Sequence, residues 1–386
     1  MKKIRVVIKS LCMVALIAGL STAFIGTSVA CRIYGVISNN IPDGLLQSHL
    51  ITEPNSIKNL SKEKNGDGWG IAYLINFGAK PIIEHGAERA YHSQGYDSAV
   101  SSMASRQLKI ALTHIRNCSS GCCDHNNETI PNPHPFSRTK NNRTWLFIHN
   151  GFADKAALTN LIGEEYLKKN PPDGSGIPQC NPGNLDNIVD SELLFLFLLK
   201  NIEANNWSVV NGIVDTVHPL QADYLNFILT DGYTIWAYRK GFELCYSYDA
   251  QRGFTVLTSQ HPSANKDNWI DLDNNELVIA PVNRAPEIIN LSTCGDGADD
   301  PYEMCDIINN NCELSHGQNW KCNTRTCQCE LTGDVNYDGK VDWQDVFTVF
   351  NLALGNGAST GDSDCNGDGT VNFKDALCVM SKMRSR

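Results

Sequence analysis

The sequence has no apolar run after residue 30 that is long enough to cross a membrane. The longest such run, residues 193–199, has seven residues, whereas a spanning helix needs roughly 20. Basic residues are also scarce, with 32 lysines and arginines against 42 acidic residues and a net charge of −10. A chain of this charge is not expected to have nucleic acid as its natural partner. With 386 residues, it is long enough for two or three domains of roughly 150 residues each.

Cysteine, by contrast, is abundant. The chain has 15 cysteines, which indicate disulfides in an exported protein and a metal or redox site in a cytosolic one. The first residues favour export: basic residues between Lys2 and Lys9 precede the apolar residues 11–25, and small residues end the segment at Ala30. This pattern is typical of a secretory signal peptide, and a membrane anchor, the alternative, would need a longer apolar stretch. We therefore predict a signal peptide over residues 1–30 and a secreted, extracellular protein with no transmembrane segment in its mature chain.

Cleavage after Ala30 would make Cys31 the first residue of the mature chain. Ser28 and Ala30 are small residues at the two positions that such a cleavage site requires. A lipoprotein signal also ends directly before a cysteine, and lipidation would cap the thiol, but such signals usually carry an apolar residue where this chain has Ser28. Simple cleavage, which we favour, leaves a thiol and an α-amine on the same residue. A lipidated Cys31 would instead indicate a non-catalytic, surface-anchored binding protein.

Residues 31–289 have the pattern of one α+β domain that mixes strands and helices. Alternating or continuous apolar runs predict strands, and the clearest of them cover residues 71–74, 145–148, 226–229 and 234–238. Residues 190–192 and the apolar run that follows them predict an N-capped helix that is buried on more than one face. Residues 169–187, rich in proline, glycine and asparagine, predict a long loop near a functional surface.

The composition changes at Cys294. Six cysteines fall between Cys294 and Cys329, with few aliphatic residues among them, so this segment is not expected to fold around an apolar core. We predict a small disulfide-rich module over residues 290–330, whose pairing the sequence leaves open. A zinc site is the alternative, but paired Cys-x-x-Cys spacings are absent.

The last segment, residues 331–386, contains a duplicated pattern of oxygen-bearing residues. Aspartate or asparagine recurs at the first, third, fifth, ninth and twelfth positions of two loops, with glycine at the sixth. This spacing is the one with which a loop surrounds a single calcium ion. Together with the seventh positions, the predicted ligands are Asp334, Asn336, Asp338, Lys340, Asp342 and Asp345 in the first loop and Asp364, Asn366, Asp368, Thr370, Asn372 and Asp375 in the second. We therefore predict two structural calcium ions in a small α-helical domain.

Each calcium loop runs directly into a helical pattern, and neither loop is preceded by a helix. Both loops also have aspartate at the twelfth position, where an EF-hand usually has glutamate. The segment from Leu331 to about Met383 thus resembles a dockerin, the duplicated loop–helix module that binds a cohesin. The resemblance implies a cohesin-bearing scaffold or surface protein as partner. It also places Trp343 and Phe373 where dockerins contact that partner; packing in the core is the alternative for these aromatic residues.

A free N-terminal cysteine can act as a nucleophile without a separate histidine. The thiol has an unperturbed pKa of about 8.5 and needs a base at neutral pH, and the α-amine, with a pKa of about 7.7–8.0, suits that task. Downstream, His149, Asn150 and Gly151 end a predicted strand. The Asn150 amide and the Gly151 N–H would stabilise the oxyanion of an acyl transfer. A plain hairpin turn is the commoner meaning of an Asn-Gly pair.

Seven short motifs occur one after another along the chain. They are Cys31-Arg32-x-Tyr34-Gly35, Asp67-Gly68-Trp69-Gly70, His114-x-Arg116, His134-Pro135-Phe136, Phe147-Ile148-His149-Asn150-Gly151, Asp190-Ser191-Glu192 and Leu229-Thr230-Asp231-Gly232. In this order they resemble the class II glutamine amidotransferases over about residues 31–285. The resemblance implies an N-terminal-nucleophile (Ntn) hydrolase fold, a four-layer αββα sandwich.

The resemblance also implies a reaction. Cys31 attacks the side-chain amide of glutamine, releases ammonia and forms a γ-glutamyl thioester that water hydrolyses. Asn150 and Gly151 form the oxyanion hole, and catalysis needs no cofactor. The segment after residue 290 is too short for the synthase domain that normally consumes the ammonia, so we expect a hydrolase of glutamine or of a γ-glutamyl amide. An Ntn amidase for another linear amide is the alternative.

Four further residues are implied to bind the substrate. Arg116 would hold its α-carboxylate through a bidentate guanidinium, and Asp190 would pair with its α-ammonium. His114 and His134 would shape the pocket. For Arg116 the alternative is a surface ion pair, and for Asp190 it is a helix N-cap, a role that is compatible with substrate binding.

The number of cysteines leaves a second thiol to be explained. Cys12 belongs to the signal peptide, Cys31 is expected as a thiol, six cysteines belong to the disulfide-rich module, and Cys365 and Cys378 are candidates for a pair. Five remain in the catalytic domain, namely Cys118, Cys122, Cys123, Cys180 and Cys245. Because five is an odd number, we predict a second thiol that is unpaired or intermolecular. Disulfides around residues 117–123 would tighten or alter the expected glutamine site.

Overall fold

The computed structural model describes residues 30–118, 122–123, 128–180, 187–220, 222–263, 267–291, 312, 320–323, 328–336, 338–356, 363–366, 368 and 370–383. The predicted signal peptide, apart from Ala30, and most of the predicted disulfide-rich module lie outside these residues. Within the described ranges, no helix is long and apolar enough to span a bilayer.

Two antiparallel sheets form the centre of the fold. Over the described residues the first sheet has the strand order β11-β9-β10-β1-β4-β2-β3, and the second has the order β13-β12-β8-β7-β6-β5. Their strands are β1 (Arg32–Ser38), β2 (Trp69–Leu74), β3 (Ile82–Gly86), β4 (Ile110–Ile115), β5 (Phe136–Lys140), β6 (Arg143–Gly151), β7 (Leu225–Thr230), β8 (Thr234–Tyr238), β9 (Cys245–Asp249), β10 (Phe254–Thr258), β11 (Ile270–Asp271), β12 (Glu276–Pro281) and β13 (Glu287–Asn290). The predicted strands at 71–74, 145–148, 226–229 and 234–238 all lie within these elements.

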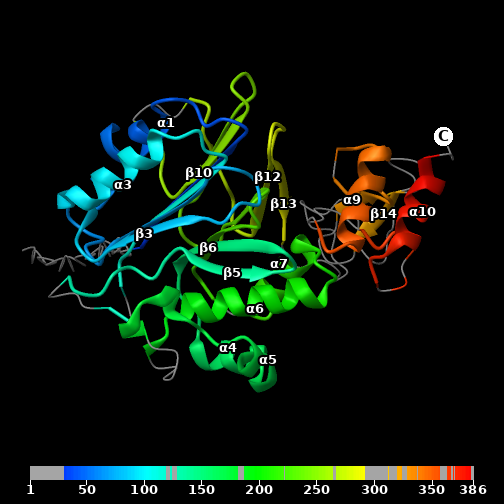
Figure 1. Cartoon of the computed structure of the whole chain (residues 1–386), viewed down its shortest axis with the longest axis horizontal. Helices are drawn as coiled ribbons and strands as arrows, with labels where there is room; N and C mark the ends of the chain where they lie inside the picture. The colour runs from blue at the N-terminus through cyan, green and yellow to red at the C-terminus, as the bar shows by residue number, and fades with distance from the viewer. Residues whose placement is uncertain are drawn as a thin grey trace, which may run out of the picture.

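Helices cover the outer faces of both sheets (Figure 1). The helical elements before residue 220 are α1 (Leu45–Gln47), η1 (Ser48–Thr52), α2 (Ile57–Leu60), η2 (Ala90–His92), α3 (Gln94–Ala104), α4 (Lys155–Ile162), α5 (Glu164–Lys169), η3 (Gly174–Gly176), η4 (Pro178–Cys180), α6 (Asp190–Ala204) and α7 (Val209–Val217). Residues of α3 pack with the first sheet, and residues of α4, α6 and α7 pack with the second. The layers therefore follow the order helix, sheet, sheet, helix, and the prediction of a mixed α and β domain is confirmed.

Alternation along each strand divides the core between layers. In β1, Ile33 and Ile37 point into the space between the sheets, whereas Tyr34 and Val36 point toward α3. Gly35 lies between the sheets, where an added Cβ would come within 3.3 Å of Ile228 on the opposite sheet. Because both faces of such a strand are buried, its sequence is a nearly continuous apolar run.

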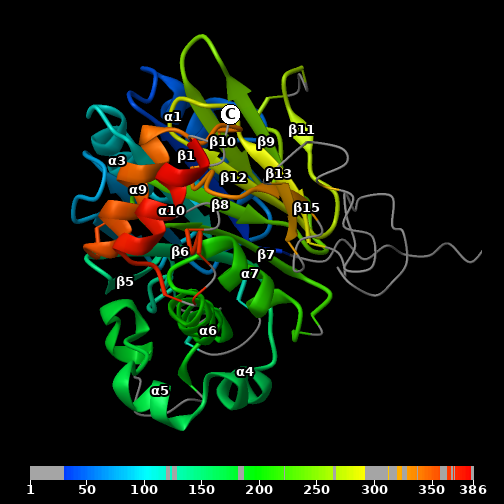
Figure 2. The ribbon, with the colours of Figure 1, turned by 90° about the vertical axis from the view of Figure 1, so that its right-hand side faces the viewer.

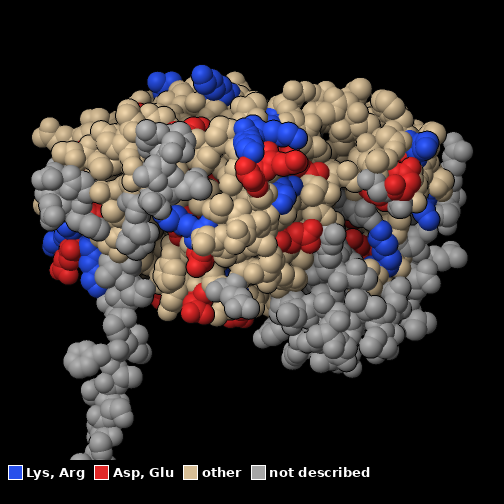
Figure 3. All heavy atoms as spheres, turned by 90° about the horizontal axis from the view of Figure 1, so that it is seen from below, with Lys and Arg blue, Asp and Glu red and all other residues tan. Residues whose placement is uncertain are grey.

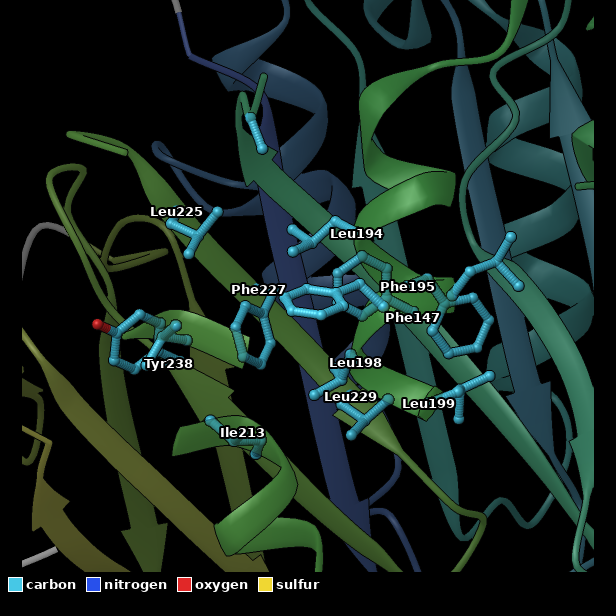
Figure 4. Close-up of a cluster of buried hydrophobic side chains, with 14 of the residues drawn as sticks. Phe147, Leu194, Phe195, Leu198, Leu199, Ile213, Leu225, Phe227, Leu229 and Tyr238 are labelled. Carbon is cyan, nitrogen blue, oxygen red and sulfur yellow. The ribbon is translucent and has the colours of Figure 1, made fainter. Parts of the chain in front are cut away.

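Helix α6 is the most deeply buried helix of the catalytic part. All side chains from Ser191 to Leu199 are buried, because the second sheet covers one side of α6 and α4 and α7 cover others. Phe195 stacks on Phe147 of β6 with ring centroids 5.2 Å apart, as Figure 4 shows. Burying each such side chain contributes about 1.5–3 kcal/mol. The prediction that this helix is buried on more than one face is confirmed.

A separate small unit follows a two-stranded ribbon. The ribbon is formed by β14 (Trp320–Asn323) and β15 (Gln328–Leu331), and the unit contains α9 (Trp343–Ala353) and α10 (Phe373–Met383). The two helices lie side by side (Figure 2) and share a core of Val346, Val349, Ala376 and Val379. This unit touches the catalytic part where Arg284 donates to the carbonyl oxygen of Asn336, at 2.7 Å.

Disulfides occur in all three parts of the chain. The structure pairs Cys118 with Cys123, Cys122 with Cys180, Cys312 with Cys329, and Cys365 with Cys378. Among the described cysteines, Cys31 and Cys245 carry thiols. Of the five cysteines other than Cys31 in the catalytic part, four form disulfides and Cys245 keeps its thiol.

Candidate active site

Cys31 lies directly before β1, a central strand of the first sheet, and is half-buried. Its Sγ is 3.4 Å from the backbone N–H of Asn117, which donates to it, and 3.5 Å from the Asn117 carbonyl oxygen. Burial raises the pKa of the Cys31 thiol, while the Asn117 N–H and the Arg116 charge act in the opposite direction. Because the net shift is upward, the thiol is protonated at neutral pH and needs a base before it can attack.

Arg116 follows the end of β4 and is buried, with 4% of its surface exposed. It is therefore not part of a surface ion pair. Its Nη1 donates to the carbonyl oxygen of Cys122. Burial lowers the pKa of Arg116, and the charges of Cys31, Asp67 and Asp190 raise it. Arg116 is therefore within electrostatic range of both the thiol and the Asp190 carboxylate.

Asp190 is the first residue of α6, so one detail of the sequence interpretation is wrong. The N-cap is Val189, which makes no side-chain cap. The carboxylate of Asp190 instead accepts from the backbone N–H of Ala153, at 2.7 Å, and from that of Ser191, at 2.9 Å. The negative charge is close enough to Cys31 to raise the pKa of its thiol.

The Asn-Gly pair at the end of β6 is not a hairpin turn. Strand β6 pairs with β7 as far as Gly151, and the chain then continues into α4. Asn150 has 1% of its surface exposed, yet neither polar atom of its amide has a hydrogen-bond partner among the described residues. Gly151 is required by close packing, because an added Cβ would lie 2.2 Å from the carbonyl oxygen of Tyr224.

Three buried histidines line this region. The rings of His114 and His134 stack with centroids 3.9 Å apart, and His114 Nε2 lies 3.0 Å from the carbonyl oxygen of His149. Burial lowers the pKa of His114 to about 3 and that of His149 to about 4, and it lowers the pKa of His134 well below its usual value. All three are therefore neutral at pH 7. Gly70 lets the His134 segment approach, since a Cβ there would lie 1.8 Å from the His134 carbonyl oxygen.

The structure brings together most of the residues that were predicted to act together. The charges of Cys31, Arg116 and Asp190 shift one another's pKa values. The Asp190 charge also acts to raise the pKa of His149, which precedes Asn150. The roles of these residues stay predictions.

Sequence reasoning missed several neighbours of Cys31. Asn65 donates to the Ala30 carbonyl oxygen at 2.5 Å, and Arg32 donates to the carbonyl oxygens of Ala30 and Cys31 at 3.2 and 3.1 Å. Asn132 lies 2.8 Å from His114 Nδ1. Arg32 is adjacent to Cys31 in the first motif, which was a usable signal. Asn65 and Asn132 belong to irregular segments without a recognisable pattern.

The Leu229-Thr230-Asp231-Gly232 motif has a structural role. Asp231 is fully buried and forms an ion pair with the buried Arg143. The same carboxylate accepts from the backbone N–H groups of Tyr233 and Thr234, at 2.9 and 3.0 Å. It therefore holds the turn between β7 and β8.

The two predicted calcium loops have the geometry and the donor atoms that a cation requires. Asp345 and Asp375 have no exposed surface, and each carboxylate turns inward to accept backbone N–H groups of its own loop. In the first loop Asp334 accepts from the N–H groups of Asp338 and Gly339. The donor sets consist of hard oxygens at the predicted spacing, which fits Ca²⁺. If calcium is bound, the carboxylates and amides of the predicted set would hold it and the ion would offset their charge.

The other predicted ligands lie in the same two loops. Asn336 and Asn366 accept from the backbone of Asp338 and Asp368, the fifth residues of their loops. Side-chain oxygens of Asp338, Asp342, Asp364, Asp368 and Asn372 accept local N–H groups, and Lys340 and Thr370 contribute backbone donors to these turns. The described residues of each loop are thus folded around a common centre.

The face seen from below in Figure 1 mixes basic and acidic side chains. Figure 3 shows Lys and Arg interspersed with Asp and Glu over the described part of this face. No continuous basic surface extends across that part, as the net charge of −10 leads one to expect.

Comparison with known proteins identifies two regions. The family model of the class II glutamine amidotransferases matches residues 53–265, and that of the type I dockerin domain matches residues 332–384. No curated protein sequence matches the chain.

Several solved structures are similar at low identity. Glutamine phosphoribosylpyrophosphate amidotransferase from B. subtilis is 14% identical with a TM-score of 0.44, and the match covers 68% of this chain and 49% of that one. A glutamine aminotransferase class-II domain protein from Silicibacter pomeroyi is 17% identical, with a TM-score of 0.40 and coverage of 68% and 100%. A predicted glutamine amidotransferase from Pseudomonas aeruginosa is 18% identical, with a TM-score of 0.34 and coverage of 66% and 95%.

The assignment rests on the family models and not on these distant likenesses. The amidotransferase model matches more than half of the 386 residues. The chain thus belongs to the class II glutamine amidotransferases, and its amidotransferase domain is followed by a type I dockerin domain.

Proposed function

We propose that this chain is a secreted N-terminal-cysteine amidohydrolase that cleaves the side-chain amide of glutamine or of a γ-glutamyl amide. The observation that carries the proposal is the Asn150 amide, which is buried without a partner among the described residues. Buried polar atoms are normally hydrogen-bonded. An unpaired amide in the same region as Cys31 is what a site for a transient oxyanion requires.

The nucleophile in this proposal is the Cys31 thiolate. Burial keeps the thiol protonated at neutral pH, and the α-amine that cleavage after Ala30 would release accepts its proton. The Cys31 sulfur then attacks the carbon of the substrate amide. The amide oxygen becomes an oxyanion, which the Asn150 side chain and the Gly151 N–H stabilise. The amine returns the proton to the leaving nitrogen, so that ammonia or an amine departs and a γ-glutamyl thioester remains. Water hydrolyses the thioester and regenerates the thiol.

The charges beside Cys31 support an amino-acid substrate. Arg116 is buried and carries a planar guanidinium suited to a carboxylate, and the Asp190 carboxylate offers a partner for an ammonium group. A linear amide that lacks a carboxylate and an ammonium group would make no ion pair with either residue. The neutral His114 and His134 shape the pocket and add no competing charge.

We further propose the domain limits given by the sequence: a catalytic domain over 31–289, a disulfide-rich module over 290–330 and a dockerin domain over 331–386. The run of strands from Arg32 to Asn290 and the helices α9 and α10 support these limits. Hydrolysis needs no cofactor in this scheme. Two structural calcium ions stabilise the dockerin domain.

The dockerin domain implies a cohesin partner, and we propose that this partner tethers the enzyme to a scaffold or cell surface. Several large apolar side chains of α9, of its C-cap residue Leu354 and of α10 are exposed, namely Trp343, Phe347, Phe350, Leu354, Phe373 and Leu377. Exposed aromatic residues of this kind act as anchors at protein interfaces. Their exposure argues against the core-packing alternative for Trp343 and Phe373, and the disulfides agree with an extracellular setting.

The proposal is tested with the mature chain, after mass spectrometry of its N-terminus. Ammonia and glutamate release from glutamine, and capture of the thioester as a hydroxamate by hydroxylamine, should both disappear in Cys31→Ala. A chain that retains Ala30 keeps the thiol but lacks the amine, so it should also be inactive. A lipidated Cys31, or amide hydrolysis by Cys31→Ala, would overturn the proposal.

The proposed substrate-binding residues Arg116 and Asp190 are tested with matched control variants. Arg116→Gln and Asp190→Asn should each raise KM for glutamine strongly. Arg106→Gln and Asp43→Asn, at exposed positions, should not. If both site variants cleave glutamine like the wild type, the substrate is another linear amide.

A further inference from the structure

A second cluster of reactive side chains lies at the far edge of the first sheet. Cys245 opens β9, Asp271 ends β11, and His261 follows β10. Asp271 and Cys245 are direct cross-strand partners, so their side chains point to the same face. One ligand atom from each of the three residues lies within 4.8 Å of the other two.

We propose that Cys245, His261 and Asp271 bind one zinc ion. A thiolate, an imidazole and a carboxylate form a mixed donor set that suits zinc and is unlike the all-oxygen sets that calcium and magnesium prefer. Ligand atoms around a tetrahedral zinc lie roughly 3–4 Å apart, given zinc–ligand distances of about 2.0–2.3 Å. Separations within 4.8 Å are closed by small side-chain rotations.

The surroundings leave room for a fourth ligand. The three residues line a cavity of about 320 Å³ together with Glu243 and Arg239. The Arg239 guanidinium is directed to the carbonyl oxygens of Phe242 and Leu272, while the Glu243 carboxylate adds negative charge to the same cavity. Either that carboxylate or a water molecule completes the coordination, as in zinc sites with three protein ligands.

The same residues fit a catalytic triad less well. The Cys245 thiol is directed to the carbonyl oxygen of Thr258, at 3.3 Å. The Asp271 side chain is 69% exposed, whereas an aspartate that orients a catalytic histidine is normally buried. His261 Nε2 and Asp271 Oδ1 lie 2.8 Å apart, at hydrogen-bond distance. Zinc binding would replace this hydrogen bond with two metal–ligand bonds and move the two atoms slightly apart.

One short segment connects the proposed zinc site with the residues next to Cys31. Ser259, two residues before His261, exchanges hydrogen bonds with the backbone of Ile33: its N–H donates to the Ile33 carbonyl at 3.0 Å, and its Oγ accepts from the Ile33 N–H at 2.9 Å. Ile33 is two residues from Cys31. Zinc would therefore fix the chain segment that holds the start of β1.

The experiment uses the full mature chain in saturating calcium, which occupies the dockerin domain, and in a Cys31→Ala background, which removes the other described thiol. Cobalt(II) replaces zinc as a spectroscopic probe, because a thiolate ligand produces an intense charge-transfer band. We expect one equivalent of cobalt with this band, displaced by one equivalent of zinc. Cys245→Ser should abolish the band, and His261→Gln and Asp271→Asn should weaken cobalt binding by about tenfold or more.

His92→Gln, which changes an exposed histidine elsewhere, serves as the matched control and should bind cobalt like the background chain. Absence of the band in the background chain, or an unchanged band in Cys245→Ser, would overturn the proposal. If Cys245→Ser does not fold, the exposed Asp271→Asn variant decides: an unchanged cobalt affinity in that variant refutes the site.

Discussion

Two asparagines on neighbouring strands provide a direct test of the proposed oxyanion hole. Asn150 on β6 and Asn226 on β7 are opposite each other in the strand register, and both are buried. The Asn226 amide donates to the carbonyl oxygens of Phe242 and Glu243, at 2.9 and 3.2 Å, and accepts from the Lys240 N–H at 2.8 Å. The Asn150 amide has no such partner among the described residues. Leucine, which is similar in size to asparagine, should therefore have opposite effects on stability at the two positions.

The expected magnitudes follow from these contacts. Asn150→Leu removes a buried polar group that is unsatisfied in the empty enzyme, a gain of about 1–3 kcal/mol. Asn226→Leu removes three satisfied hydrogen bonds, a loss of about 1.5–4.5 kcal/mol at about 0.5–1.5 kcal/mol for each bond. For a domain of this size each kcal/mol shifts Tm by about 2–4 °C. The Asn150 variant should melt at or above the wild-type temperature, and the Asn226 variant should melt several degrees below it.

The Asn150→Leu variant should lose activity although it keeps its stability. Loss of one oxyanion donor lowers kcat by about 10²–10³-fold, so Asn150→Leu should be nearly inactive although it is fully folded. Calorimetry and glutaminase kinetics on the same preparations measure both quantities. The reasoning is refuted if Asn150→Leu lowers Tm as much as Asn226→Leu does, or if it keeps kcat within about tenfold of the wild type.

Three further predictions concern pH, calcium and a disulfide. Because burial lowers the pKa of His114 to about 3 and that of His149 to about 4, the unfolded chain binds protons below pH 6.5 that the folded chain does not. Stability should therefore fall from about pH 6.5 toward pH 4 by up to about 1.4 kcal/mol per pH unit and histidine, and His149→Gln should show a shallower Tm profile. Chelation should unfold residues 331–386 and abolish cohesin binding, and calcium should restore both; a calorimetric trace that does not respond to chelator contradicts two structural calcium ions. Replacing both Cys365 and Cys378 by serine opens a loop with a sequence separation of 13 and should destabilise the helix pair by about 3 kcal/mol, seen as an earlier melting step; an unchanged step would show that calcium alone sets this stability.

The central strands could be predicted because both of their faces are buried. The strand predicted over residues 226–229 lies in β7 (Leu225–Thr230), whose residues are all buried, so the apolar run is continuous. By contrast, β11 has two exposed residues and no apolar pattern to detect. Helix α3 does have the spacing of an amphipathic helix in Tyr96, Ala99, Val100 and Met103, so its sequence carries a local signal. Pairing across the sheets depends on residues far apart in the sequence and has no local signal.

The candidate site residues were predicted from the order of the motifs, whereas their contacts could not be predicted. The sequence indicated Asp190 as a residue that starts a helix, but its carboxylate also binds the Ala153 N–H, 37 residues away. Arg116 was identified with a surface ion pair as the alternative, and its burial decides against that alternative. The cluster of Cys245, His261 and Asp271 has no fixed spacing, because the register of β9 with β11 and the chain after β10 bring it together.

The contrast between Asn150 and Asn226 shows why a local sequence pattern does not predict the hydrogen bonds of a buried side chain. Both asparagines lie in buried strands, and both are preceded and followed by residues that alternate between layers. What distinguishes them is whether other segments supply partners. The chain after β8 turns back so that Lys240, Phe242 and Glu243 satisfy Asn226, and no described segment does this for Asn150. An unpaired buried amide costs stability, and no local sequence pattern tells whether a distant segment or a ligand supplies its partners.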